Sequence, residues 1–439
     1  MKFYNRESEI ARLQHIQYQS SENAQFTVVT GRRRIGKTQL LLKATALQPT
    51  LYFFVSRKAE AFLCQDFQQE VIEKLNFPLF GNNTEFGKLF LFLMELSKER
   101  AFNLIIDEFQ EFENINPSIY SDMQHYWDVH KEQSRMNLIV CGSVYSLMHK
   151  IFKNYKAPLF GRATEFMNVK PFTIATLKNI LEENNPKYTQ EDLLALYGFT
   201  GGVAKYVQLF VNNKALTLKK MIDLMISEDS AFIADGKNML IEEFGKGYAV
   251  YFSILSAIAR GDNTRSKIEA SLGKEISGYL TRLENDYNII RKNLPIFTKS
   301  KTKNLRYVIE DNFLTFWFRF IYKYNHIIEI AQYNELKKII QRDYSTFSGK
   351  ILERYFRQKF IELGGITRIG SFWDKSGENE IDLIMLNELQ CKAQIAEIKR
   401  NEQHIRYNLL KNKVEALKNS TKELEGYDIE YLGLSMKNI

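Results

Sequence analysis

The chain has 439 residues, which at roughly 150 residues per domain is enough for about three domains. Hydrophobic residues make up 45% and charged residues 26% of it, a composition that excludes a largely disordered or fibrous protein. The formal net charge of +8 permits a nucleic-acid partner without requiring one.

The first part of the chain alternates short apolar runs with stretches of helical character. Continuous apolar runs separated by helices indicate a parallel sheet that is buried on both faces. We therefore expect an α/β domain over residues 1–172. Its strands are expected in the runs 26–30, 51–55, 103–107, 137–143 and 165–170.

The first run is followed at once by a complete GxxxxGK[ST] pattern, which opens a helical stretch. The glycines let successive backbone N–H groups face phosphates at a helix N-terminus. In this pattern Lys37 reaches the β- and γ-phosphates, and the Thr38 hydroxyl ligates Mg²⁺. The sequence therefore predicts an ATP and Mg²⁺ site made by Gly31, Arg32, Arg33, Arg34, Ile35, Gly36, Lys37, Thr38 and Gln39.

A pair of acids follows the apolar run 103–107. That run is expected to form a buried strand whose C-terminal end presents Asp107 and Glu108. We expect Asp107 to hold Mg²⁺ through water and Glu108 to polarise the attacking water. An apolar run before Asp-Glu is commonplace, so this interpretation depends on the phosphate loop upstream.

Five motifs occur in order along the first part of the chain: FYNRESEI, GRRRIGKTQLL, LIIDEFQ, CGS and PLFGR. In these motifs the chain resembles the AAA+-related ATPases described as predominantly archaeal, which belong to the wider STAND-like group. The resemblance implies a polar sensor at Ser143 and, at Arg162, a catalytic arginine for its own or a neighbouring subunit. A homo-oligomer is therefore left open. The alternatives are a helix-capping Ser143 and an ordinary ion pair of Arg162.

Residues 173–243 are mainly helical in character, and the resemblance implies that they form the lid on the ATPase core. Next come a helix ending at Gly261, a short helix capped by Thr264, and a third helix over 274–286. Strand-like runs follow at 289–297 and 306–309. This order resembles the winged helix-turn-helix found after the ATPase core in the same family, here over 244–318.

A winged helix of this kind binds DNA by placing its third helix in the major groove while basic wing residues contact phosphates. The third helix is mixed in charge, with Glu275, Glu284 and Asp286 beside Lys274 and Arg282. The alternative is a winged helix that serves only for packing or signalling. The expected wing has one acid, Glu310, and six basic residues: Arg291, Lys292, Lys299, Lys301, Lys303 and Arg306.

A helical connector (319–347) leads to a last domain (348–439), whose first helix carries Glu353. Two strand-like runs then carry Asp382 and, fifteen positions later, Glu397, followed by Lys399. If the runs pair as a hairpin, Asp382 and Glu397 can bind a divalent cation, Lys399 can orient water, and Glu353 completes the site.

The order of these four residues resembles the PD-(D/E)xK nuclease superfamily, which implies a restriction-endonuclease-like α/β fold. The alternative is a catalytically silent domain in which Asp382 and Lys399 form a structural ion pair.

The sequence thus predicts an α/β, AAA+-like P-loop ATPase that is DNA-associated and couples its nucleotide state to a winged helix and a nuclease-like domain. The competing hypotheses are a nucleotide switch that acts through protein partners and a ring-forming remodelling ATPase. Three separated cysteines, charged first residues and no run of ~20 apolar residues predict a cytoplasmic protein without a membrane partner.

Overall fold

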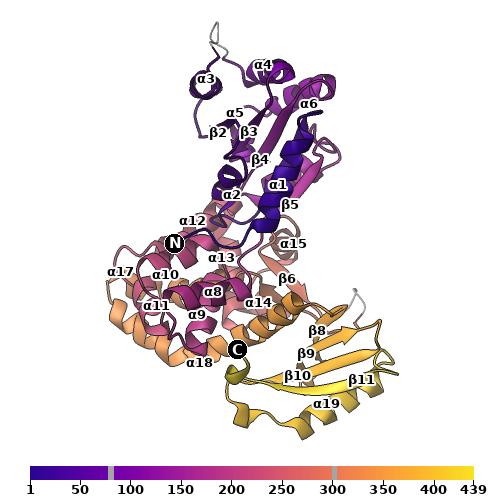
Figure 1. Ribbon diagram of the computed structural model, residues 1–439. Coiled ribbons are helices and arrows are strands. Elements are labelled where there is room, and N and C mark those ends of the chain that lie inside the picture. The colour runs from indigo at the N-terminus through magenta and orange to yellow at the C-terminus, as the bar shows by residue number, and fades with distance from the viewer. Residues whose placement is uncertain (78–83, 299–303) are drawn as a thin grey trace. The chain divides into compact units, whose positions relative to one another are not determined.

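The computed structural model describes residues 1–77, 84–298 and 304–439 (Figure 1). The chain divides into two compact units, one of residues 4–171 and one of residues 1–3 with 172–439. The boundary lies beside residue 172, where the sequence places the end of the ATPase core. The finer division of the second unit into lid, winged helix, connector and last domain stays a prediction. Within the described ranges, no helix is long and apolar enough to cross a membrane.

The unit of residues 4–171 alternates strands with helices. Its strands are β1 (Gln25–Thr30), β2 (Thr50–Phe54), β3 (Phe102–Asp107), β4 (Met136–Cys141) and β5 (Glu165–Asn168). Its helices are α1 (Glu7–Gln19), α2 (Lys37–Ala44), α3 (Glu60–Leu75), α4 (Phe86–Glu99), α5 (Phe112–Ile115), α6 (Ile119–His130) and α7 (Tyr145–Lys153).

The strands form one sheet in the order β2-β3-β4-β1-β5, with each neighbouring pair parallel. This confirms the α/β fold and the parallel sheet predicted from the five apolar runs. Every residue of β3 and β4 is buried, as expected for strands covered on both faces. Because β1 and β3 flank β4 and run the same way, the loop after β1 and the acids after β3 open at the same edge of the sheet.

Aromatic side chains fill much of the core of this unit. Phe26 on β1 meets Trp127 of α6 edge to face, with ring centroids 5.2 Å apart. On β2, Phe53 stacks on Phe67 of α3 with centroids 4.2 Å apart, while the next residue, Phe54, is half exposed. Alternate residues of β2 therefore point into the core and toward solvent.

The second unit begins with helices, which are α8 (Ile174–Asn184), α9 (Gln190–Thr200), α10 (Ala204–Asn212), α11 (Leu218–Met225) and α12 (Ala231–Phe244). Next come α13 (Tyr248–Arg260), α14 (Arg265–Leu272), α15 (Ser277–Asn285), β6 (Ile290–Asn293) and β7 (Arg306–Ile309). The remaining elements are α16 (Asn312–Phe316), α17 (Asn325–Glu329), α18 (Tyr333–Leu363), β8 (Arg368–Trp373), β9 (Glu380–Asn387), β10 (Lys392–Ile398), α19 (Tyr407–Ser420) and β11 (Asp428–Leu434).

A four-stranded sheet in the order β11-β10-β9-β8 forms the last part of this unit. The pairs β8–β9 and β9–β10 are antiparallel, and β10–β11 is parallel. Helix α19 lies along this sheet (Figure 1), and its buried Leu410, Val414 and Leu417 share a core cluster with β9 and β10. The sequence-predicted hairpin of β9 and β10 is confirmed, together with a C-terminal sheet domain.

The contrast between Phe53 and Phe54 gives a test of the core. We expect Phe53→Ala to lower the free energy of unfolding of the unit by about 3–5 kcal/mol, because it removes a buried ring and leaves a cavity. The matched change Phe54→Ala should cost less than about 0.5 kcal/mol. Hydrogen exchange of the β2 and β3 amides in the full chain measures both effects. Equal protection in the two variants would contradict this packing.

Candidate functional site

The glycines of the phosphate loop adopt conformations that other residues rarely take. Gly31 has a φ of +150° and Gly36 one of +96°. A Cβ on Gly31 would lie 2.8 Å from the carbonyl oxygen of Val169, so a side chain there would clash with backbone. The loop ends where α2 begins, at Lys37, and thus presents backbone N–H groups and the positive end of a helix dipole. This local structure suits a phosphate group.

The Lys37 side chain is buried and folded over the loop. Its ammonium donates to the carbonyl oxygens of Gly31 at 2.9 Å and Arg32 at 3.2 Å. Burial lowers the pKa of Lys37, while the nearby Cys141, Glu108 and Asp107 act in the opposite direction. The Lys37 ammonium is thus held against the backbone of the loop, where it would contact a bound phosphate.

Asp107 is the meeting point of the two sequence motifs. Thr38 Oγ1 donates to Asp107 Oδ2 at 2.7 Å, and the Tyr52 hydroxyl donates to the same oxygen at 2.7 Å. The other oxygen, Oδ1, accepts from Cys141 Sγ at 2.8 Å and from the Glu108 backbone N–H at 2.9 Å. Thr38 of the phosphate-loop motif and Asp107 of the acid pair are therefore in direct contact.

Glu108 follows Asp107 in the left-handed backbone region, with a φ of 54°. Its carboxylate accepts from Ser143 Oγ at 2.9 and 3.2 Å and from Gln110 Nε2 at 2.6 Å. The structure thus places Ser143, proposed from sequence as a sensor, beside the second acid. Gln110 was not identified from sequence, because nothing in its position two residues after Glu108 distinguishes it from a loop residue.

Arg162 lies at the amino ends of the parallel strands, whereas the phosphate loop lies at their carboxyl ends. It precedes β5, which is parallel to β1, so it lies near the amino end of β1 while the loop follows the carboxyl end. The two edges are separated by about 20 Å for a strand of six residues. Arg162 pairs instead with Asp128 at 3.0 Å. The prediction that Arg162 acts on phosphates of its own chain is therefore wrong, and action on a neighbouring copy stays a prediction.

Comparison with known proteins agrees with this site. Residues 3–210 match the family described as an ATPase domain predominantly from Archaea. An uncharacterised protein of Methanocaldococcus jannaschii is 31% identical over 408 residues, which cover 90% of this chain and 87% of the relative. The chain belongs to this family of predominantly archaeal ATPases. Residues 317–416 also match a family described as archaeal and bacterial proteins of unknown function.

Solved structures with the same fold include a Walker-type ATPase of Pyrococcus abyssi. It is 21% identical, and the match covers 72% of this chain and 96% of that chain with a TM-score of 0.57. The ORC2 protein of Aeropyrum pernix, solved in ADPNP and ADP complexes, is 11% identical over 78% of this chain and 96% of its own, with a TM-score of 0.49. This archaeal-type ATPase thus has the fold of a P-loop ATPase core.

In the second unit of this archaeal-type ATPase, the three helices and two strands expected of a winged helix are all present. Thr264 caps α14 by accepting from the Lys267 backbone N–H, and Gly273 ends that helix with a φ of +61°. Helix α15 begins at Ser277, three residues later than predicted, because the Glu275 carboxylate accepts the Ser277 N–H at 3.0 Å and holds the turn outside the helix. The strands β6 and β7 pair antiparallel.

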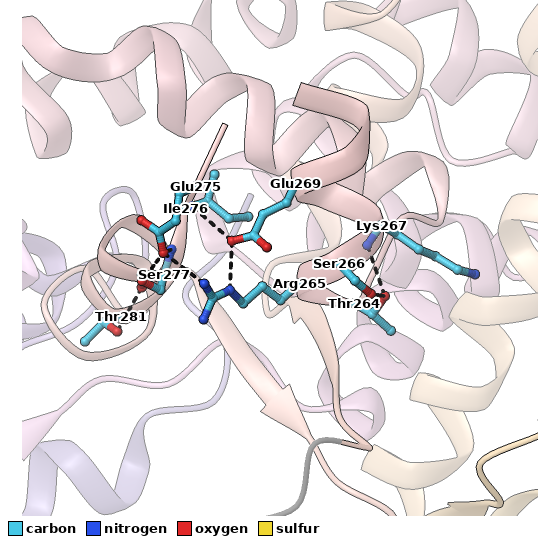
Figure 2. Close-up of polar contacts among 9 residues, drawn as sticks. All are labelled: Thr264, Arg265, Ser266, Lys267, Glu269, Glu275, Ile276, Ser277 and Thr281. Carbon is cyan, nitrogen blue, oxygen red and sulfur yellow. Dashed lines mark hydrogen bonds and ion pairs between the residues drawn. The ribbon is translucent and has the colours of Figure 1, made fainter. Parts of the chain in front are cut away.

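Arg265 fixes the turn between α14 and α15. Figure 2 shows its guanidinium between Glu269 and Glu275, to which it donates at 2.8 and 2.9 Å. Glu269 also accepts the Ile276 N–H at 3.3 Å. Glu275, the acid at the start of the predicted recognition helix, is therefore paired within the chain, and Arg265 stabilises the turn between the two helices.

The described basic residues of the predicted wing form ion pairs within the unit. Each of its basic residues in the described part of the wing pairs with an acid: Arg291 with Glu310, Lys292 with Glu284, and Arg306 with Glu380 at 2.6 Å. Lys299, Lys301 and Lys303 lie outside the described residues. The partners Glu284 and Glu380 come from α15 and β9, outside the predicted wing, and contact of the wing with DNA stays a prediction.

The β9–β10 hairpin brings Asp382, Glu397 and Lys399 together. The Lys399 ammonium lies 3.0 Å from Asp382 Oδ2 and 3.7 Å from Glu397 Oε1. Asp382 Oδ2 also accepts the Ile398 N–H at 2.8 Å. Burial opposes charge on Lys399, but the two carboxylates outweigh it and raise its pKa. The acids are thus gathered around a lysine.

Glu353 does not complete a metal site. The described ranges hold no group of three or more His, Cys, Asp or Glu side chains placed to bind a metal ion, so the predicted set of Glu353, Asp382 and Glu397 is wrong as a three-ligand site. Burial, followed by the charges of Asp382 and Glu380, raises the pKa of Glu353 to about 7. The remaining donor set is the pair Asp382 and Glu397, with Lys399 between them.

Proposed function

We propose that this chain hydrolyses ATP with Mg²⁺ at the carboxyl edge of its parallel sheet. The observation that carries the proposal is the 2.7 Å contact between Thr38 Oγ1 and Asp107 Oδ2. A hydroxyl and a carboxylate in contact beside a buried lysine are the groups that hold Mg²⁺ in P-loop ATPases. The donor set fits the cation, which would neutralise charge on the phosphates.

The residues of the site have separate tasks in this proposal. The loop N–H groups and Lys37 bind the phosphates, while Thr38 and Asp107 hold the cation. Glu108 accepts a proton from the attacking water, since its carboxylate follows directly on the strand that carries Asp107. Ser143 and Gln110 orient that carboxylate through the hydrogen bonds described above.

Glu108→Gln should separate binding from hydrolysis. The amide keeps the size of the side chain and cannot accept the proton, so we expect phosphate release to fall by about 100-fold or more. Affinity for a fluorescent ATP analogue should stay near that of the wild type. Lys37→Ala is the control, because it should lose binding itself. Hydrolysis at the wild-type rate in Glu108→Gln would refute the assigned base.

We propose further that the ATPase associates with DNA through α15. Its exposed positions include Thr281, Arg282 and Asn285, while the acids Glu275 and Glu284 are paired within the unit. Arginine and asparagine side chains suit the edges of guanine and adenine in the major groove. The observation that favours this function is the order of α13, α14, α15, β6 and β7, in which α15 would be the second helix of a helix-turn-helix.

Arg282→Ala should weaken DNA binding by on the order of tenfold. Fluorescence anisotropy with a labelled duplex at several salt concentrations measures the effect, because binding by counterion release falls steeply with salt. Arg342→Ala is the matched control, since Arg342 is an exposed helical arginine on α18. No salt-dependent binding by the wild type would favour the switch that acts through protein partners.

A third candidate function is cleavage of DNA by the last domain. It is favoured by the juxtaposition of Asp382, Glu397 and Lys399 on the β9–β10 hairpin, and opposed by the ion pair that Lys399 makes. Incubation of plasmid with Mg²⁺ or Mn²⁺ tests it. Cleavage should be lost in Asp382→Ala and kept in Asp428→Ala, a change at the start of β11. Intact plasmid under all conditions would leave Asp382 and Lys399 as a structural pair.

A further inference from the structure

Tyr52 reaches the acid pair from the strand next to it. It lies on β2, where the parallel register pairs it with Ile105, two residues before Asp107. Its hydroxyl donates to Asp107 Oδ2 at 2.7 Å, the oxygen that Thr38 Oγ1 also contacts at 2.7 Å. Tyr52 thus lies outside both the phosphate-loop motif and the acid pair, and it contacts Asp107 directly.

The Tyr52 hydroxyl acts as a donor to this carboxylate. An ionised carboxylate can only accept a hydrogen bond, so the phenol proton points to Asp107 Oδ2. The ring lies partly buried on β2, so its position is fixed by the sheet.

The two oxygens of Asp107 are held independently. Cys141 and the Glu108 N–H hold Oδ1, whereas Thr38 and Tyr52 hold Oδ2. Without the Tyr52 hydroxyl, Thr38 would be the remaining described donor to Oδ2. Thr38 is itself a proposed ligand of Mg²⁺. Its hydrogen bond to Asp107 would therefore change when the cation binds.

We propose that Tyr52 is a positioning residue for Mg²⁺. Its hydroxyl keeps the Asp107 oxygen next to Thr38, so that the two groups that receive the cation are adjacent before nucleotide arrives. The inference rests on the proposed Mg²⁺-dependent hydrolysis of ATP at this site. Groups that orient metal ligands from the next layer typically change metal affinity or activity by about 10–100-fold.

The test is Tyr52→Phe in the full chain, which removes one oxygen and keeps the ring. Binding of a fluorescent, non-hydrolysable ATP analogue is measured in EDTA and over a Mg²⁺ titration. In EDTA we expect the affinity of the variant to match the wild type, because Lys37 and the loop are unchanged. The Mg²⁺ concentration at half-saturation should rise about tenfold. The same rise is expected for the Mg²⁺ dependence of phosphate release.

Tyr120→Phe is the matched control. Tyr120 is a buried tyrosine of the same unit whose hydroxyl donates to the Phe109 carbonyl at 3.4 Å rather than to Asp107. Its Mg²⁺ titration should match the wild type. An unchanged Mg²⁺ titration in Tyr52→Phe, or an equal loss in EDTA, would overturn the role of Tyr52. A wild type whose binding and hydrolysis ignore Mg²⁺ would instead overturn the proposed function.

Discussion

The nucleotide site depends on the Asp107 carboxylate. Its contacts join residues from four strands or strand ends: Thr38 after β1, Tyr52 on β2, Glu108 after β3 and Cys141 on β4. The parallel order of these strands makes this possible, because their carboxyl ends meet at the same edge. The sheet thus acts as a rigid frame that fixes one acid from several directions.

The phosphate loop of the same unit requires glycine at position 31 and gives the buried Lys37 its hydrogen-bond acceptors. Gly31 passes close to the Val169 carbonyl, so the loop turns tightly at the end of β1. The tight turn puts the Gly31 and Arg32 carbonyls within reach of the Lys37 ammonium, which satisfies that buried cation. Gly31 and Arg32 therefore both form the tight turn of the loop and provide hydrogen-bond acceptors for the buried Lys37 ammonium.

The sequence was enough to predict this sheet and the positions of Lys37, Thr38, Asp107 and Glu108, since apolar runs and motif spacing are local features. Tyr52, Cys141 and Gln110 could not be found in this way. Their contacts depend on which strands become neighbours and on how a side chain is oriented, and neither is encoded in a short pattern.

Residues 244–318, which are predicted to form a winged helix, show the limit of counting charges along a sequence. The wing was expected to be basic, yet Arg306 pairs with Glu380, a residue 74 positions later in the sequence. Lys292 pairs with Glu284 on α15. Basic residues in the described part of the wing are therefore paired with acids from other elements, whereas Arg282 on α15 is exposed to solvent.

The acids around Asp107 and around Asp382 differ in their hydrogen-bonding partners. Among the described residues, the donors that contact Asp107 are neutral, namely two hydroxyls, a thiol and a backbone N–H. The nearby Lys37 ammonium instead donates to the Gly31 and Arg32 carbonyls, so no ion pair occupies the Asp107 oxygens in this part of the structure. Asp382 instead contacts the Lys399 ammonium at 3.0 Å, and this lysine also faces Glu397. A divalent cation would have to compete with a positive charge there. Together with the Thr38 hydroxyl beside Asp107, this difference in partners makes the first group of acids the better site for Mg²⁺.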